Sequence, residues 1–296
     1  MASLEGLAPI DGFVVAAVIA KALSYAAAFL ALGGALFAAV FPKLPIRVQT
    51  GLVRTTAAAA VAGLLFLVVR IGLRAARISG MGVEGMTDPT MVLIVWESPL
   101  GTAVFVQALG FFLTLAVLLR GPIPQTLSVI GATLIAIAFT EVGHSLGDER
   151  ALLATFLAVH ILTGAFWVGA LYPLFRASSD VDEGPAILER FGRIASASVL
   201  ILVLAGTAFA YISVGSLSAL INTAYGLLLL AKIALVALLL GLAAVNKMRL
   251  VPGIATGVPG AVPAFRHSVM FEACLVALIL LVTATLTSIT TPPMNL

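Results

Sequence analysis

Long runs of apolar residues, separated by short polar connections, are the dominant pattern along this chain. Eight runs are long enough to cross a bilayer, which takes about 20 helical residues. They cover residues 11–41, 52–78, 99–120, 124–145, 150–175, 191–214, 217–249 and 263–290. Pro99, Pro124 and Pro263 stand at the start of three runs, where a missing backbone N–H costs nothing. The pattern predicts an all-α polytopic membrane bundle of about eight transmembrane helices in one domain, with seven or nine as the alternatives.

Composition supports a lipid environment. Hydrophobic residues make up 61% of the chain and charged residues 10%, whereas a soluble domain carries roughly 25% charged residues. The net charge of +3 is no sign of nucleic-acid binding, because no basic patch with interleaved aromatic residues accompanies it. The single cysteine, Cys274, excludes a disulfide framework or a cluster of thiolate ligands within one chain.

The distribution of basic residues predicts the orientation. The first, third, fifth and seventh connections and their flanks hold ten Lys and Arg residues, and the other three hold four. Because Lys and Arg collect in cytoplasmic loops, this bias places both termini outside, which is the periplasm for a bacterial inner membrane. The outer connections also collect acidic residues, which are Glu84, Asp88, Glu97, Glu141, Asp148 and Glu149.

A short internal repeat is visible at an offset of 125 residues. Ser-Pro-Leu-Gly at 98–101 is followed by Gln107, and Thr-Ala-Tyr-Gly at 223–226 is followed by Lys232. Both segments open a helix that enters from outside. The match predicts two parallel repeats of four helices. Their bounds would be 1–145 and 146–296.

Ionisable and polar residues inside the apolar runs are the first candidates for function, because a charge near the bilayer centre costs several kcal/mol unless it is partnered. They are Lys21, Gln107, Glu141, His160, Lys232 and Glu272. For Lys21, Lys232 and Glu272 we favour interhelical ion pairing that stabilises the bundle. The alternative is that these charges gate or compensate a moving cation.

Glu141 and His144 form a Glu-x-x-His pair at the outer end of the predicted fourth helix. Residues three apart on a helix share a face, so a carboxylate and an imidazole can converge on one cation. Carboxylate-bridged metal sites in bundles need two such copies, and only one is present. A pair exposed to water at the helix end is therefore an equal alternative.

His160 lies ten residues into the predicted fifth helix, which is roughly 15 Å below the outer surface. Trp167 follows two turns later on the same side. Neutral imidazole binds late transition metals, so His160 is a candidate metal ligand or proton relay; the alternative is a hydrogen bond to a neighbouring helix. Hairpin geometry separates the depths of His144 and His160 by about 14 Å, which predicts two stations rather than one site.

Three methionines, Met81, Met86 and Met91, stand five residues apart in the Gly-rich second connection. Thioether sulfur is a soft donor suited to Cu(I). Methionine is also common as interfacial filler, which is the alternative.

Several of these residues stand in segments that resemble the copper resistance protein D family. Gly143-His144-Ser145, followed by His160-Ile and by Trp167-Val-Gly-Ala-Leu, is similar to that family's Gly-His-Ala, His-Leu and Trp-x-Gly-Gly-Leu. Further similar segments are 190–193 with 204–207, 222–226 with 230–232, 266–268 with Glu272, and 292–293. Two departures are Gly206 before Thr207, where the family has Thr-Gly, and Ala170, where a second Gly is usual.

The resemblance implies an inner-membrane protein that moves copper between periplasm and cytoplasm, alongside a separate periplasmic copper-binding protein. We expect inward transport, with copper captured by Glu141, His144, Met81 and Met86. The ion would then pass to His160. Trp167, Lys232, Glu272, Lys21 and Gln107 would line the pathway or support it. The chain carries no Gly-x-x-x-x-Gly-Lys loop, so transport is expected to be passive or ion-coupled, and no enzymatic activity is expected.

Three alternatives remain open. A membrane haem protein would use His144, His160 or His267 as axial ligands, which requires two histidines at similar depth. A metal-dependent enzyme would use the single Glu-x-x-His. A docking subunit would only bind the periplasmic copper protein.

Overall fold

The computed structural model describes residues 11–141 and 150–290 of the chain. The long helices are α1 (Gly12–Val40), α2 (Ile46–Ser79), α4 (Pro99–Thr114), α5 (Pro122–Ala138), α6 (Arg150–Ala177), α7 (Gly184–Val214), α9 (Ala224–Val245) and α11 (Ala261–Ile289). Shorter elements are η1 (Gly82–Met86), α3 (Pro89–Trp96), η2 (Leu115–Leu118), α8 (Leu217–Asn222), a π-helical segment (Asn246–Leu250) and α10 (Val251–Ala255).

The predicted all-α membrane bundle is confirmed. Within the described residues, seven helices are long and apolar enough to cross a membrane. The eighth predicted span corresponds to α5, which is apolar but has 17 residues. Every predicted span thus contains a helix, and α5 is the short member of the set.

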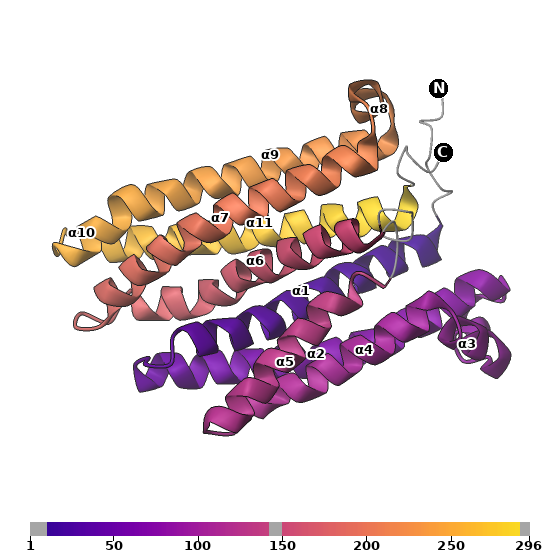
Figure 1. Cartoon of the computed structure of the whole chain (residues 1–296), viewed down its shortest axis with the longest axis horizontal. Helices are drawn as coiled ribbons and strands as arrows, with labels where there is room; N and C mark the ends of the chain where they lie inside the picture. The colour runs from indigo at the N-terminus through magenta and orange to yellow at the C-terminus, as the bar shows by residue number, and fades with distance from the viewer. Residues whose placement is uncertain (1–10, 142–149, 291–296) are drawn as a thin grey trace.

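The long helices lie side by side along the longest axis of the molecule (Figure 1). Helix α1 packs on α2, α6 and α11, whereas α7 packs chiefly on α6 and α9 chiefly on α11. One end of the bundle, called here the terminal end, holds α3, α8, and the described chain ends at 11 and 290. The opposite end, called the basic end, carries the α1–α2, α6–α7 and α10–α11 connections. Its basic residues include Lys43, Arg47, Arg176, Arg190, Lys247 and Arg266.

Two predicted boundaries are wrong. Helix α5 ends at Ala138 rather than near 145, and the predicted span 217–249 is divided into α8, α9 and the π-helical segment. The division at Thr223 has a local cause, because its hydroxyl oxygen accepts a hydrogen bond from the Gly226 amide at 3.1 Å and caps α9.

The two segments of the predicted repeat share this local structure. Ser98 caps α4 as Thr223 caps α9, and each follows a short helix. A methyl group at Gly101 would lie 1.8 Å from the Trp96 carbonyl oxygen, and one at Gly226 would lie 2.2 Å from the Leu220 carbonyl oxygen. Both turns therefore require glycine. The wider four-helix repeat stays a prediction.

Helices α1 and α6 meet backbone to backbone near the middle of the bundle. A methyl group at Gly33 would lie 1.8 Å from the Ala165 carbonyl oxygen, and one at Gly169 would lie 2.1 Å from the carbonyl carbon of Gly33. Close crossings of this kind at small residues are typical of helix pairs in membranes. We call this contact the glycine seam.

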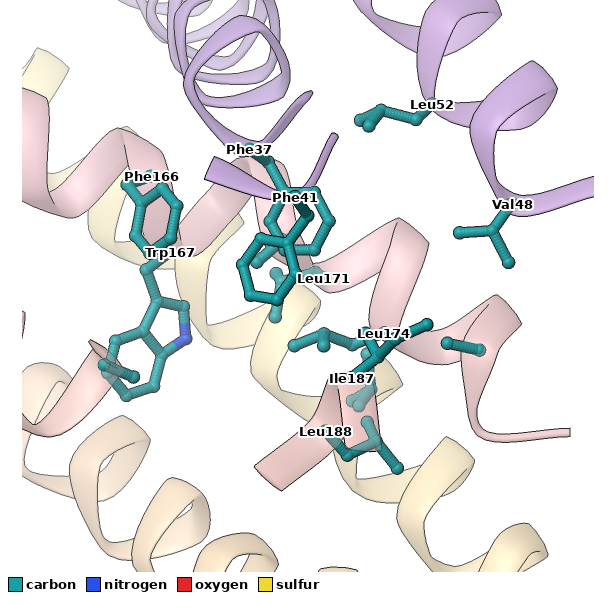
Figure 2. Close-up of a cluster of buried hydrophobic side chains, with 14 of the residues drawn as sticks. Phe37, Phe41, Val48, Leu52, Phe166, Trp167, Leu171, Leu174, Ile187 and Leu188 are labelled. Carbon is teal, nitrogen blue, oxygen red and sulfur yellow. The ribbon is translucent and has the colours of Figure 1, made fainter. Parts of the chain in front are cut away.

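An aromatic core lies beside the seam, toward the basic end. The rings of Phe37 and Phe41 stack with their centroids 4.4 Å apart (Figure 2). Phe166 lies 6.1 Å from Phe37, and Trp167 lies edge-on to Phe191 at 6.3 Å. This packing joins α1, α6 and α7, and it holds the Trp167 ring in place.

Candidate functional site

Glu141 lies outside α5, three residues after its last residue, Ala138, and its predicted pairing with His144 stays a prediction. Helix α5 ends early, and the next ring, Phe139, packs on Tyr25 at 5.2 Å and Phe29 at 6.4 Å. Those α1 residues lie well inside the bundle. The short α5 thus places Glu141 deeper than expected, because it follows Phe139 by two residues. His144 lies outside the described residues.

The predicted methionine donors have different surroundings. Met81 is half exposed at the terminal end, with 50% of its surface accessible. Met86 packs against α2, with its methyl carbon 3.3 Å from the position that a Cβ at Gly72 would take. Met81 is therefore the accessible thioether of the two, and Met86 also fills space against α2.

His160 points at α7. Its Nδ1 lies 3.3 Å from the Leu202 carbonyl oxygen, and since a carbonyl only accepts, Nδ1 is the donor in this contact. The lone pair of Nε2 is then available as a ligand or proton acceptor. Gly206 makes room for the ring, because a methyl group there would lie 3.0 Å from Nδ1. Gly206, one of the two departures from the family pattern, is thus in contact with the His160 ring.

Lys232 of α9 lies close enough to His160 to act on it electrostatically. In the part of the chain that the structure describes, no three or more His, Cys, Asp or Glu side chains gather into a metal-binding group. A copper ion at His160 would therefore need further donors of another kind.

The best-formed polar site lies about two helical turns from His160, toward the basic end and on the same side of α6. Glu272 of α11 is buried, with 4% of its surface exposed. Its Oε2 accepts a hydrogen bond from Trp167 Nε1 at 3.2 Å, and its Oε1 accepts one from Asn246 Nδ2 at 2.6 Å. Asn246 begins the π-helical segment, a wide turn of a kind that is frequent at functional sites.

We favoured interhelical ion pairs for Lys21, Lys232 and Glu272, and the described residues do not form them. Glu272 is bonded to two neutral donors, and Lys21 Nζ donates to the Thr287 carbonyl at 2.8 Å. Lys232 makes no hydrogen bond or ion pair with any described residue. Glu272 and Thr287 are 15 positions apart on α11, roughly 22 Å along its axis, so Lys21 and Glu272 are too far apart to pair.

A cavity of about 490 Å³ borders the Glu272 site and extends toward the basic end. Apolar side chains of α6, α7, α9 and α11 form most of its wall, including Leu171, Val199, Leu240 and Val269. Lys247 Nζ donates to Ser196 Oγ and joins the π-helical segment to α7 beside the cavity. The arrangement offers a buried carboxylate access to a space that can hold water.

Two other predicted features lie apart from this site. Gln107 is buried in α4, which packs on α2 and α5.

His267 is exposed, five residues before Glu272, whereas His160 lies seven residues before Trp167. Since Trp167 and Glu272 are bonded, the two histidines differ in depth by roughly 18 Å. The described histidines therefore do not form the axial pair that the haem alternative requires.

Asn246 and Gly206 are the site residues that sequence reasoning missed. Asn246 stands at the end of an apolar run and resembles the start of a polar connection. Gly206 is one of several glycines in helices and gives no signal that it faces a histidine. Only the three-dimensional pairing of helices identifies either residue.

Comparison with known proteins gives consistent matches over most of the chain. The family model for the N-terminal domain of copper resistance protein D-like proteins matches residues 10–155, and the model for copper resistance protein D matches residues 185–286. The copper resistance protein D of Pseudomonas syringae pv. tomato is 31% identical over 232 residues, which cover 72% of this chain and 71% of that protein. No solved structure matches.

Proposed function

Because the chain belongs to the copper resistance protein D family, we propose that it transports copper across the membrane. The observation that carries the proposal is a line of polar side chains from α6, α11 and the π-helical segment inside the bundle. His160 forms its first level, and Trp167, Glu272 and Asn246 form its second level. The cavity continues this line toward the basic end. Intramembrane polar residues are expensive and mark ion pathways by default.

The direction we propose is inward, from the periplasm through a bacterial inner membrane to the cytoplasm. Met81 and Met86 at the terminal end would collect copper together with Glu141 and His144, and His160 would receive it. A periplasmic copper-binding protein, as a separate chain, would deliver the ion. The soft thioether of Met81, which is half exposed, suits capture of Cu(I).

Copper entry into liposomes tests this proposal. Purified protein is reconstituted, and entry is followed with a trapped copper-responsive dye. We expect His160→Ala to lower the rate roughly tenfold or more, as loss of a metal-site group does. His144→Ala should have a similar effect if capture is limiting. His267→Ala is the matched control, because it removes an exposed histidine, and its rate should equal that of the unmodified protein.

Equal copper entry for the unmodified protein and for His160→Ala would contradict the pathway. Empty and protein-containing liposomes with the same leak rate would contradict transport itself. In that case a docking subunit becomes the better account, since docking at the terminal end does not need a histidine inside the bundle.

A further inference from the structure

Glu272 is a buried carboxyl group without a cationic partner among the described residues. Both of its hydrogen bonds come from neutral groups, the Trp167 indole at 3.2 Å and the Asn246 amide at 2.6 Å. A lone carboxylate in a low-dielectric interior is expensive, and it is stabilised when it takes up a proton or a cation. The site is thus built to bind something positively charged.

The side-chain amide of Asn246 also indicates that Glu272 binds a positively charged group. Asn246 is 6% exposed, and its Oδ1 is buried without a hydrogen-bond partner among the described residues. Ser268, one turn before Glu272 on α11, has a second buried hydroxyl oxygen in the same state. Buried polar groups are normally satisfied, so an unsatisfied amide oxygen on the side chain that binds Glu272 calls for an explanation.

Rotation of the Asn246 amide by a half turn explains the geometry. A separation of 2.6 Å is short for an N–H···O bond and typical of an O–H···O bond. With Glu272 ionised, Nδ2 donates to Oε1. With Glu272 protonated, the rotated amide presents Oδ1, which accepts the carboxyl O–H. Asn246 can therefore form a hydrogen bond with the Glu272 carboxyl group in either protonation state without movement of the backbone.

A proton fits this site better than a metal ion does. Both neighbours of the carboxyl group, the Trp167 indole N–H and the Asn246 amide N–H, are donors and supply no lone pair to a metal. Within the described chain no further His, Cys, Asp or Glu joins Glu272 in a ligand cluster.

The cavity supplies the route for the proton. At about 490 Å³ it has room for several water molecules, each of which occupies about 30 Å³. The charged groups that border it are Glu189 and Arg193 of α7 and Lys247 of the π-helical segment, and the residues of α6, α10 and α11 on its wall other than Glu272 are uncharged. These three groups lie toward the basic end, so a proton leaving Glu272 meets them on that side.

We propose that Glu272 binds and releases a proton through this cavity, with Asn246 rotating to follow it. A hydronium ion in the cavity gives its proton to the carboxylate and leaves a water molecule, and the reverse step returns it. We further propose that movement of this proton is coupled to movement of copper. This coupling rests on the transport function proposed above.

Tryptophan fluorescence tests the proton site without any transport. The chain has two tryptophans, and in a Trp96→Phe protein the remaining indole, Trp167, donates directly to Glu272. We expect its emission to change in a single step as pH is varied, because the charge next to the indole N–H changes. Glu272→Gln should abolish the step. Glu189→Gln, which removes the other carboxyl group bordering the cavity, should retain it.

Three results would overturn the proton site: no step in the Trp96→Phe protein, a step that survives Glu272→Gln, or a midpoint that changes when sodium chloride is replaced by choline chloride. The last result would identify a sodium site instead. An infrared difference spectrum of the same Trp96→Phe protein guards against misfolding of the glutamine variant. The band of a protonated carboxyl group should appear with the same midpoint as the fluorescence step, and a different midpoint would count against the assignment.

Liposomes that contain both a copper dye and a pH dye test the coupling. We expect copper entry to be accompanied by a pH change that is lost in Glu272→Gln. Copper entry without a pH change would overturn the coupling. No copper entry at all would overturn the transport function itself. The Trp167 titration decides the proton site independently of both outcomes.

Discussion

Trp167 connects the two polar levels of the bundle, since it lies seven residues after His160 on α6 and donates to Glu272 on α11. Its ring is held by Phe191 and the aromatic core. The indole N–H therefore has a fixed position, and the Glu272 carboxyl group is oriented by it. A buried side chain with this double role should be sensitive to a substitution that keeps an aromatic ring and removes the donor.

Trp167→Phe should destabilise the protein by about 1 to 3 kcal/mol, because it leaves a buried carboxyl oxygen without its donor. Thermal unfolding in detergent measures the change. Trp96→Phe is the matched control, since Trp96 is 46% exposed, and it should unfold at nearly the original temperature. Equal shifts for the two variants would show that the hydrogen bond to Glu272 contributes nothing specific.

Gly206→Ala should slow copper entry while leaving the protein folded. The added methyl group would lie 3.0 Å from His160 Nδ1 and would push the ring away from the Leu202 carbonyl. Gly241→Ala in α9 provides the comparison, because a methyl group there meets nothing within 4 Å. Copper entry at the same rate in both variants would show that the position of the His160 ring does not affect transport.

The sequence predicted which residues are functional candidates more successfully than it predicted their hydrogen-bond partners. The sequence identified His160, Trp167 and Glu272, because polar groups in apolar runs stand out. It could not identify the Trp167–Glu272 bond, which joins residues 105 positions apart. Partner choice depends on the rotation and depth of each helix, and neither can be read from the spacing of residues within one helix.

At the scale of helices, the glycine seam makes the strongest prediction. Gly169→Ala should lower the thermal unfolding temperature in detergent, because the methyl group would lie 2.1 Å from the backbone of α1 and the helices would have to separate. Overpacking of this kind costs about 1 to 3 kcal/mol. Gly164→Ala, on the same helix, meets only ordinary contacts at 3.5 Å or more and should be tolerated. Equal unfolding temperatures for the two variants would contradict the close crossing.

The existence of the helices was predictable, and their ends were less so. Hydropathy located every long helix, because lipid forces the backbone to satisfy its own hydrogen bonds. It did not locate the end of α5 at Ala138, since Phe139 is apolar and continues the run. It also joined α8 to α9, because the Thr223 cap acts through one hydroxyl group rather than through a change in hydropathy.

For the whole molecule, the orientation is the prediction to test. In a Cys274→Ser background, a membrane-impermeant thiol reagent added to cells from outside should label Leu217→Cys and should not label Val181→Cys until the membrane is opened. Both positions are strongly exposed, at 82% and 89%. Leu217 begins α8 at the terminal end, and Val181 lies in the α6–α7 connection at the basic end. The reverse labelling pattern would place both described chain ends in the cytoplasm.

The glycine seam also limits how the bundle can change shape. Where two backbones touch, neither helix can slide or turn without collision, so α1 and α6 behave as one rigid body. Helix α7 rests chiefly on α6, and α9 has its buried residues only in its first turn. If the proposed transport alternates access between the two faces of the membrane, we expect α7 and α9 to tilt against this rigid pair. Spin labels on these two helices should report changing separations during turnover, while labels on α1 and α6 stay at a constant distance.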